Sequence, residues 1–112
     1  MAKRVLIGAE TIGRGDDELG SLLMANFLYT LARADRKPAA VMLMNGGVRL
    51  ACTGSKALDD LGLLAEAGIP IKVCGTCLDH LGLTDALAVG EVGTMPAAVD
   101  AFLGDDEILA IR

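Results

Sequence analysis

Short apolar runs alternate with longer amphipathic stretches along the whole chain, and this alternation restricts the fold more than any other feature. The runs expected to form strands are residues 4–9, 39–44, 69–73, 86–89 (the weakest) and 107–111. The stretches expected to form helices are residues 17–35, 55–67, 76–81 and 95–103. Apolar strands joined by helices are typical of parallel sheets covered on both faces. We therefore predict an α/β protein, a three-layer α/β/α sandwich with a mainly parallel sheet of four or five strands.

The first expected helix, residues 17–35, carries a large apolar residue at every fourth position. Leu19, Leu23, Phe27 and Leu31 follow this spacing, which places them on one side of a helix. Acidic residues at the start of the stretch suit the positive end of the helix dipole. Leu22 and Leu28 widen this stripe, and we expect the resulting apolar arc to be the buried face of the helix.

Length and charge limit the classes of protein to which the chain can belong. Its 112 residues are the length of a single domain, expected over residues 1–112. The net charge of −5 argues against binding to phosphate backbones or anionic lipid, and one Tyr and two Phe are too few for a base-stacking surface. The longest uncharged run, residues 19–32, is shorter than the roughly 20 apolar residues of a membrane span. We expect neither nucleic-acid nor membrane partners.

The start of the chain predicts its compartment. A basic beginning is followed by an apolar stretch that stops at Glu10, too short for the core of a signal peptide. We therefore expect a cytoplasmic protein, whose three cysteines are reduced thiols at rest.

Three segments should meet at one edge of the sheet. In open parallel sheets, ligands and reactive groups gather at the carboxyl ends of the strands. Residues 10–16, 45–53 and 74–80 follow three of the predicted strands, and the last two segments contain Cys52, Cys74 and Cys77. The functional site is predicted at this edge.

The segment from Cys74 to His80 contains the strongest catalytic candidates. Cys74 ends a predicted strand where a helix begins, so backbone N–H groups there would favour a thiolate. Cys77 completes a C-x-x-C pair and is a candidate for a second or resolving thiol. His80, the single histidine, comes three residues later and is a candidate for stabilising the thiolate.

Three further residues are auxiliary candidates. Cys52 should lie at the same sheet edge, and Asn45 begins the turn Asn45-Gly46-Gly47. Arg14 has a loop position from which it would steer an anionic or persulfide donor. Its loop does not match a nucleotide-binding motif, because Glu18 replaces the third glycine of G-x-G-x-x-G and the Gly-Lys-Ser/Thr of a P-loop is absent.

Three chemistries suit a C-x-x-C pair with a nearby histidine. The first is sulfur relay, in which one thiolate accepts a sulfane sulfur as a persulfide. The second is dithiol–disulfide exchange. The third is a metal site, which the tight spacing of Cys77 and His80 and the absence of a second C-x-x-C disfavour. We expect no metal and no cofactor.

Several short motifs together resemble the DsrE-like sulfur-relay family over nearly the whole chain. They are Gly13-Arg14-Gly15-Asp16 with Glu18-Leu19-Gly20, Asn45-Gly46-Gly47-Val48, Cys52-Thr53-Gly54-Ser55 and Cys74-Gly75-Thr76-Cys77-Leu78. Within the family, the chain is most similar to the DsrE-like domain of YedF-type proteins, described as sulfurtransferase-like selenium metabolism proteins.

The resemblance implies a parallel α/β/α sandwich that assembles as a homo-oligomer. It also implies that Cys74 is the sulfur acceptor, whereas Cys77 has no counterpart in the single-cysteine pattern of the characterised relatives. The implied partners are sulfur-donor and sulfur-acceptor proteins, including a TusA-like protein. We therefore predict a sulfur or selenium carrier with sulfurtransferase-like chemistry on Cys74. The alternatives are a thiol–disulfide redox protein that uses Cys74 and Cys77, and a non-catalytic subunit of a homo-oligomer.

Overall fold

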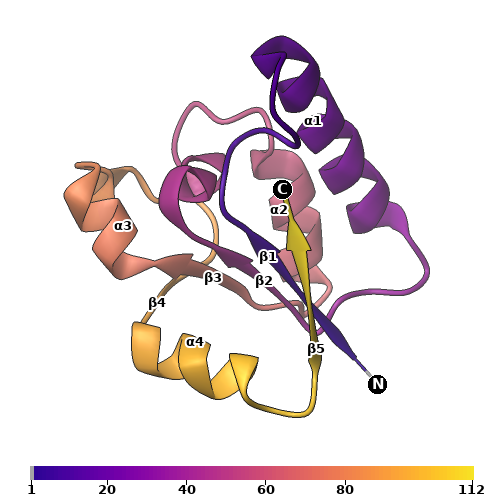
Figure 1. Cartoon of the computed structure of the whole chain (residues 1–112), viewed down its shortest axis with the longest axis vertical. Coiled ribbons are helices and arrows are strands. Elements are labelled where there is room, and N and C mark those ends of the chain that lie inside the picture. The colour runs from indigo at the N-terminus through magenta and orange to yellow at the C-terminus, as the bar shows by residue number, and fades with distance from the viewer. Residues whose placement is uncertain (1) are drawn as a thin grey trace.

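Five parallel strands form the centre of the molecule in the order β4-β3-β2-β1-β5 (Figure 1). The computed structural model describes residues 2–112. The strands are β1 (Lys3–Ile7), β2 (Ala40–Leu43), β3 (Ile71–Cys74), β4 (Glu91–Gly93) and β5 (Glu107–Ile111). The sheet confirms the predicted α/β class and the parallel arrangement.

Helices cover both faces of this sheet. They are α1 (Asp17–Arg33), α2 (Leu58–Glu66), α3 (Gly75–His80) and α4 (Met95–Phe102), with short 3-10 helices η1 (Asn45–Ala51) and η2 (Thr84–Ala86). Because crossovers between parallel strands are right-handed, the connections from β1 to β3 place α1 and α2 on one face. The connection from β4 returns to the opposite edge and places α4 on the other face (Figure 1).

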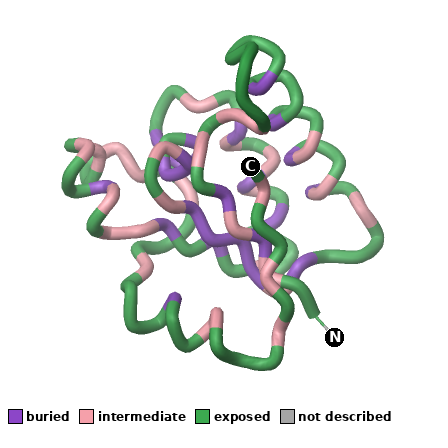
Figure 2. The backbone as a smooth tube through the Cα atoms, in the orientation of Figure 1, coloured by how far each residue is buried: buried purple, intermediate pink, exposed green. Residues whose placement is uncertain are grey.

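The main core lies between the sheet and the pair α1 and α2 (Figure 2). Alternate side chains of the strands point to this face, among them Val5, Ile7, Val41 and Leu43, and all four are buried. The face under α4 is covered less completely. Met42 of β2 and Ala98 of α4 are buried on this side. The sheet is thus closed on one face and only partly covered on the other.

The predicted apolar arc of α1 is buried only in part: Leu28 is in the core and Phe27 and Leu31 pack against it, whereas Leu19, Leu22 and Leu23 are exposed. Gly20, Met24, Leu28 and Ala32 are the buried residues of the helix, whereas Leu19 is 52% exposed. Gly20 decides the rotation of the helix, because a Cβ at Gly20 would lie 2.7 Å from Cβ of Thr11 and 3.1 Å from the Ile12 carbonyl oxygen. The close approach at Gly20 lets Met24 and Leu28 reach the core, whereas Leu19, Leu22 and Leu23 stay exposed.

The fourth strand lies at Glu91–Gly93, so the prediction of a strand at 86–89 was wrong. Leu87 instead makes an isolated antiparallel bridge with Cys52. Residues 91–93 are an exposed edge strand without an apolar run, and therefore lack the pattern that identifies a buried strand. The other predicted elements agree with the structure to within three residues at each end.

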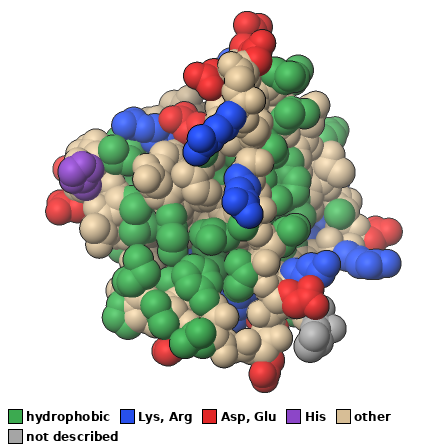
Figure 3. All heavy atoms as spheres, viewed as in Figure 1, with side chains coloured by type: hydrophobic (Ala, Val, Ile, Leu, Met, Phe, Trp, Pro, Cys, Tyr) green, Lys and Arg blue, Asp and Glu red, His purple; other side chains and the backbone are tan. Residues whose placement is uncertain are grey.

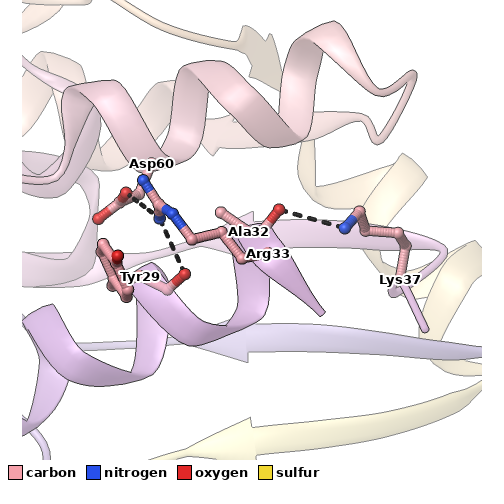
Figure 4. Close-up of polar contacts among 5 residues, drawn as sticks. All are labelled: Tyr29, Ala32, Arg33, Lys37 and Asp60. Atoms are coloured by element: carbon pink, nitrogen blue, oxygen red, sulfur yellow. Dashed lines mark hydrogen bonds and ion pairs between the residues drawn. The ribbon is translucent and has the colours of Figure 1, made fainter. Parts of the chain in front are cut away.

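Polar contacts join α1 to α2 and close the end of α1 (Figure 4). The Arg33 guanidinium donates to the Asp60 carboxylate at 2.9 Å and lies 3.6 Å from the centroid of the Tyr29 ring. Lys37 Nζ donates to the backbone carbonyl oxygens of Ala32, at 3.1 Å, and of Ala34. Cationic donors at these carbonyl oxygens oppose the negative end of the helix dipole. The Arg33–Asp60 pair thus joins α1 to α2, and Lys37 closes the C-terminal end of α1.

Candidate functional site

Two segments that follow neighbouring strands meet at the carboxyl edge of the sheet. The 3-10 helix η1 follows β2, and α3 follows β3. Their residues contact each other directly. This juxtaposition brings Cys74 and Cys77 beside Asn45, as the edge position predicted.

Cys74 is the residue at which β3 ends and α3 begins. Its sulfur accepts the backbone N–H of Cys77 at 3.4 Å, so the Cys74 side chain lies over the first turn of α3. Both thiols are free and half-buried. The intervening Gly75 packs against β4, where a Cβ would lie 2.8 Å from Cγ1 of Val92. A glycine at this position therefore lets the C-x-x-C turn pack closely against the sheet.

The Cys77 sulfur also accepts a backbone N–H, that of Asn45, at 3.1 Å. Asn45 is the one non-glycine residue with a positive φ, 49°, in residues 2–112. This left-handed conformation is unfavourable for most residues, and Asn is among the few that adopt it. The strained backbone of Asn45 directs an N–H group at a thiol, which sequence reasoning did not foresee.

The start of η1 is held close to β1 by a glycine. A Cβ at Gly47 would lie 2.3 Å from the carbonyl oxygen of Ile7, which also accepts the N–H of Met44 at 3.0 Å. Only a residue without a side chain fits there. The Gly46-Gly47 pair was the sequence signal that could have identified this close approach.

The surroundings of Cys77 favour its protonated form. Burial raises the pKa of the Cys77 thiol, and the neighbouring Cys74 side chain raises it further, while the Asn45 N–H partly opposes both effects. Cys77 therefore remains a thiol at a pH at which an ordinary cysteine already begins to ionise.

A cavity of about 540 Å³ lies between the sheet and α4, and Cys74 forms part of its wall. Met42, Met44 and Met95 contribute polarizable apolar side chains to the same wall. Hydrophobic side chains also gather on the surface over α4 and the adjacent sheet (Figure 3). The Cys74 thiol is thus accessible from the incompletely covered face of the sheet.

Two cations that line this cavity are already paired. Lys72 donates to Glu91 at 2.7 Å, and Arg4 donates to Asp106 at 3.1 Å. Their charges are largely balanced, so the cavity does not select strongly for an anion.

Cys52 is placed in the core, apart from the other two thiols. It is buried, its thiol donates to the Val48 carbonyl oxygen at 3.3 Å, and it lines a second cavity of about 430 Å³. Burial raises the pKa of the Cys52 thiol, and the charge of Arg49 lowers it in part. Neither sulfur of the C-x-x-C pair is among the hydrogen-bond partners of Cys52.

The remaining predicted residues lie on the surface. His80 is exposed at the end of α3 and is visible at the edge of the molecule in Figure 3. Arg14 is exposed in the loop before α1, between two glycines with positive φ. No hydrogen bond connects either side chain to Cys74 or Cys77 within residues 2–112.

Neither a metal centre nor a membrane-spanning helix is found in the described part of the chain. No group of three or more His, Cys, Asp or Glu side chains in residues 2–112 is arranged to hold a metal ion. Over the same residues, the helices are too short or too polar to cross a bilayer.

Comparison with known proteins gives matches at the level of structure. No family model and no curated protein matches the sequence. The crystal structure of the YchN protein from E. coli matches with a TM-score of 0.66 and 25% identity, covering 99% of this chain and 100% of that one. The fold is DsrE-like.

Two other solved structures share this DsrE-like fold. MTH1491 from Methanobacterium thermoautotrophicum has a TM-score of 0.64 and 18% identity, and covers 98% of this chain and 99% of its own. BT1422 from Bacteroides thetaiotaomicron has a TM-score of 0.60 and 14% identity, with 97% and 94% coverage. Both are described as proteins of unknown function. The DsrE-like arrangement thus extends over nearly the whole chain, in agreement with the resemblance found in the motifs.

Proposed function

We propose that this protein is a sulfur carrier of the YedF-like type, which accepts a sulfane sulfur on Cys74 and passes it to a partner protein. One observation carries the proposal: Cys74, at the carboxyl edge of a DsrE-like sheet, accepts a backbone N–H on its sulfur and lines the cavity between the sheet and α4. The fold supports this assignment, because sulfur relay is the chemistry that the family resemblance implies.

The loading step transfers one sulfur atom between two thiols. The Cys74 thiolate attacks the outer sulfur of a donor persulfide, R–S–SH. A bond forms between Cys74 Sγ and that sulfur, the donor S–S bond breaks, and the donor leaves as the thiolate R–S⁻. The backbone N–H of Cys77, 3.4 Å from Cys74 Sγ, stabilises the thiolate that begins the reaction.

Delivery is the same exchange in the opposite direction. A thiolate of the acceptor protein attacks the outer sulfur of the Cys74 persulfide and restores the Cys74 thiolate. Sulfur-donor and sulfur-acceptor proteins, including a TusA-like protein, are therefore the proposed partners, and a homo-oligomer is the proposed assembly. Selenium would follow the same route as a selenosulfide on Cys74.

Mass spectrometry of the intact protein tests the assignment. After incubation with a cysteine desulfurase and cysteine, we expect the wild type to gain one sulfur atom that a reductant removes and that maps to the Cys74 peptide. Cys74→Ser should not gain it, whereas Cys52→Ala should load like the wild type because Cys52 is buried in the core. Equal loading of Cys74→Ser and the wild type would contradict the proposal.

Thiol–disulfide exchange is a second candidate, favoured by the position of Cys74 over the first turn of α3 beside Cys77. In the same experiment, loss of two hydrogens without any gain of sulfur or release of sulfide would indicate this redox function.

A further inference from the structure

We propose that Cys77 is a resolving thiol, which discharges the Cys74 persulfide as hydrogen sulfide and leaves a disulfide between Cys74 and Cys77. This inference rests on the proposed function, because it concerns the fate of a sulfur already loaded on Cys74. It assigns to the protein a second outcome beside delivery to a partner.

The two side chains converge across one helical turn. Cys74 is the N-cap residue of α3, and Cys77 is the third residue of the helix, whose N–H the Cys74 sulfur accepts at 3.4 Å. In a capping box, the side chain at this third position points back toward the N-cap. The Cys74 side chain lies close enough to Cys77 to raise the pKa of the Cys77 thiol. A nucleophile is therefore in place beside Cys74 Sγ.

The resolving step balances without an external oxidant. The Cys77 sulfur attacks Cys74 Sγ, a bond forms between these two atoms, and the bond from Cys74 Sγ to the outer sulfur breaks. The outer sulfur takes the electron pair and, with the Cys77 proton and the persulfide proton, leaves as H₂S. The loaded sulfur is the oxidant, and the two cysteine sulfurs are oxidised to a disulfide.

Asn45 has a defined part in this step as a positioning residue. Its N–H lies 3.1 Å from Cys77 Sγ, on a backbone held at a φ of 49°. Strained backbone conformations of this kind persist where the surrounding structure imposes them, often at functional sites. The N–H stabilises the negative charge that Cys77 must carry when it attacks.

The raised pKa of Cys77 keeps the resolving reaction slow at neutral pH. Only the thiolate attacks, and burial together with the neighbouring Cys74 thiol disfavours that form. A partner protein that binds soon after loading therefore receives the sulfur. When no partner binds, the Cys74 persulfide is discharged as sulfide. Once the disulfide has formed, the protein accepts no further sulfur until a dithiol reductant opens it.

The experiment compares the lifetime of the persulfide in wild type and in Cys77→Ser. Each protein is loaded with cysteine desulfurase and cysteine, separated from donor and small thiols, and incubated without reductant. Sulfide release and intact mass are followed over time, at two protein concentrations. Cys77→Ala provides a second variant, and Cys52→Ala is the matched control for loss of a cysteine outside the pair.

In the wild type and in Cys52→Ala, we expect one equivalent of sulfide per loaded chain and a final mass two hydrogens below that of the reduced protein. The cross-link should map to Cys74 and Cys77, and the rate should not depend on protein concentration. Both Cys77 variants should keep the persulfide at least about ten times longer, because the neighbouring nucleophile is missing. Immediate sulfide and disulfide without detectable persulfide in the wild type, but not in the Cys77 variants, would support the resolving role of Cys77 and would overturn the slow rate expected from its raised pKa.

Three results would overturn the inference. One is equal sulfide release by Cys77→Ser and the wild type. Another is a release rate proportional to protein concentration, since it would show discharge between two chains. The third is absence of loading and of sulfide in every variant, which would refute the proposed carrier function itself. Normal loading with equal persulfide lifetimes would refute only the role of Cys77.

Discussion

The backbone N–H of Asn45 lies 3.1 Å from the sulfur of Cys77, although the two residues are 32 positions apart in the sequence. This contact joins η1 to α3 and makes a loop conformation after β2 part of the environment of a thiol after β3. The backbone of Asn45, rather than its side chain, supplies the polar group.

Substitutions at Asn45 should separate the backbone conformation from the side chain. Glycine adopts a positive φ freely, so Asn45→Gly should keep the N–H in place and release sulfide at a rate within about twofold of the wild type. Asn45→Val should lose about 1–2 kcal/mol of unfolding free energy and release sulfide several-fold more slowly, because a β-branched residue resists this conformation. Urea unfolding and the sulfide-release assay measure the two effects. Identical release by both variants would argue against a role for the Asn45 N–H.

Two adjacent glycines should respond very differently to alanine. At Gly47, a Cβ would lie 2.3 Å from the Ile7 carbonyl oxygen, a backbone atom that cannot move aside cheaply. We expect Gly47→Ala to lower the unfolding free energy by about 2–4 kcal/mol. Gly46→Ala is the matched control, since its Cβ would meet no atom closer than 3.9 Å, and should change stability by less than about 1 kcal/mol. Equal losses in urea unfolding would contradict the close approach of η1 to β1.

Gly75 should be coupled to Val92. A Cβ at Gly75 would lie 2.8 Å from Cγ1 of Val92, the end of a side chain on the exposed strand β4. Gly75→Ala should therefore destabilise the protein by about 1–3 kcal/mol and reduce sulfur loading at the adjacent Cys74.

Shortening Val92 provides the control for this contact. In the double variant Gly75→Ala/Val92→Ala, we expect a coupling free energy of at least about 0.5 kcal/mol and recovery of loading. Additive effects of the two substitutions would show that the contact does not limit the position of the cysteine pair.

Stability should fall at alkaline pH because of Cys52, with a contribution of the same sign from Cys77, whose pKa is also raised. Burial raises the pKa of the Cys52 thiol in the folded protein, so its stabilising effect is complete below the pKa of the unfolded thiol, about 8.5. Above that pH the unfolded chain binds fewer protons than the folded one, and the effect is lost as pH rises through the folded-state pKa. Urea unfolding under reducing conditions between about pH 7.5 and 9.5 measures the decline. Cys52→Ala should show a shallower decline, and a curve parallel to the wild type would refute this origin.

The sheet could be predicted because its central strands carry a clear pattern. Residues 40–43 of β2 are all buried, and such uninterrupted apolar runs identify strands covered on both faces. Strand β4 has three residues with an exposed pattern, and its pairing depends on the neighbouring β3 rather than on its own composition. Tertiary packing likewise decides the rotation of α1. The spacing of the leucines does not reveal that Gly20 must pack closely against Thr11 and Ile12.

The location of the site was predictable, but its contacts were not. The order of strands and the C-x-x-C spacing indicated the sheet edge and the pair Cys74 and Cys77. The contact between Asn45 and Cys77 joins two segments that are 32 positions apart in the sequence, so no local sequence pattern encodes it. Cys52 belongs to the segment that follows β2 and was therefore expected at the same edge. Its thiol instead is buried in the core and donates to the Val48 carbonyl oxygen.

The pairing of β1 with β5 has a consequence for the speed of folding. The ion pair of Arg4 with Asp106 spans 102 positions, and the five paired positions of β1 and β5 are similarly distant in sequence. Contacts of such long range slow folding, because closing the intervening chain costs conformational entropy before the contacts stabilise the structure. A newly synthesised molecule therefore exposes the hydrogen-bonding edge of β1 until β5, at the far end of the sequence, pairs with it.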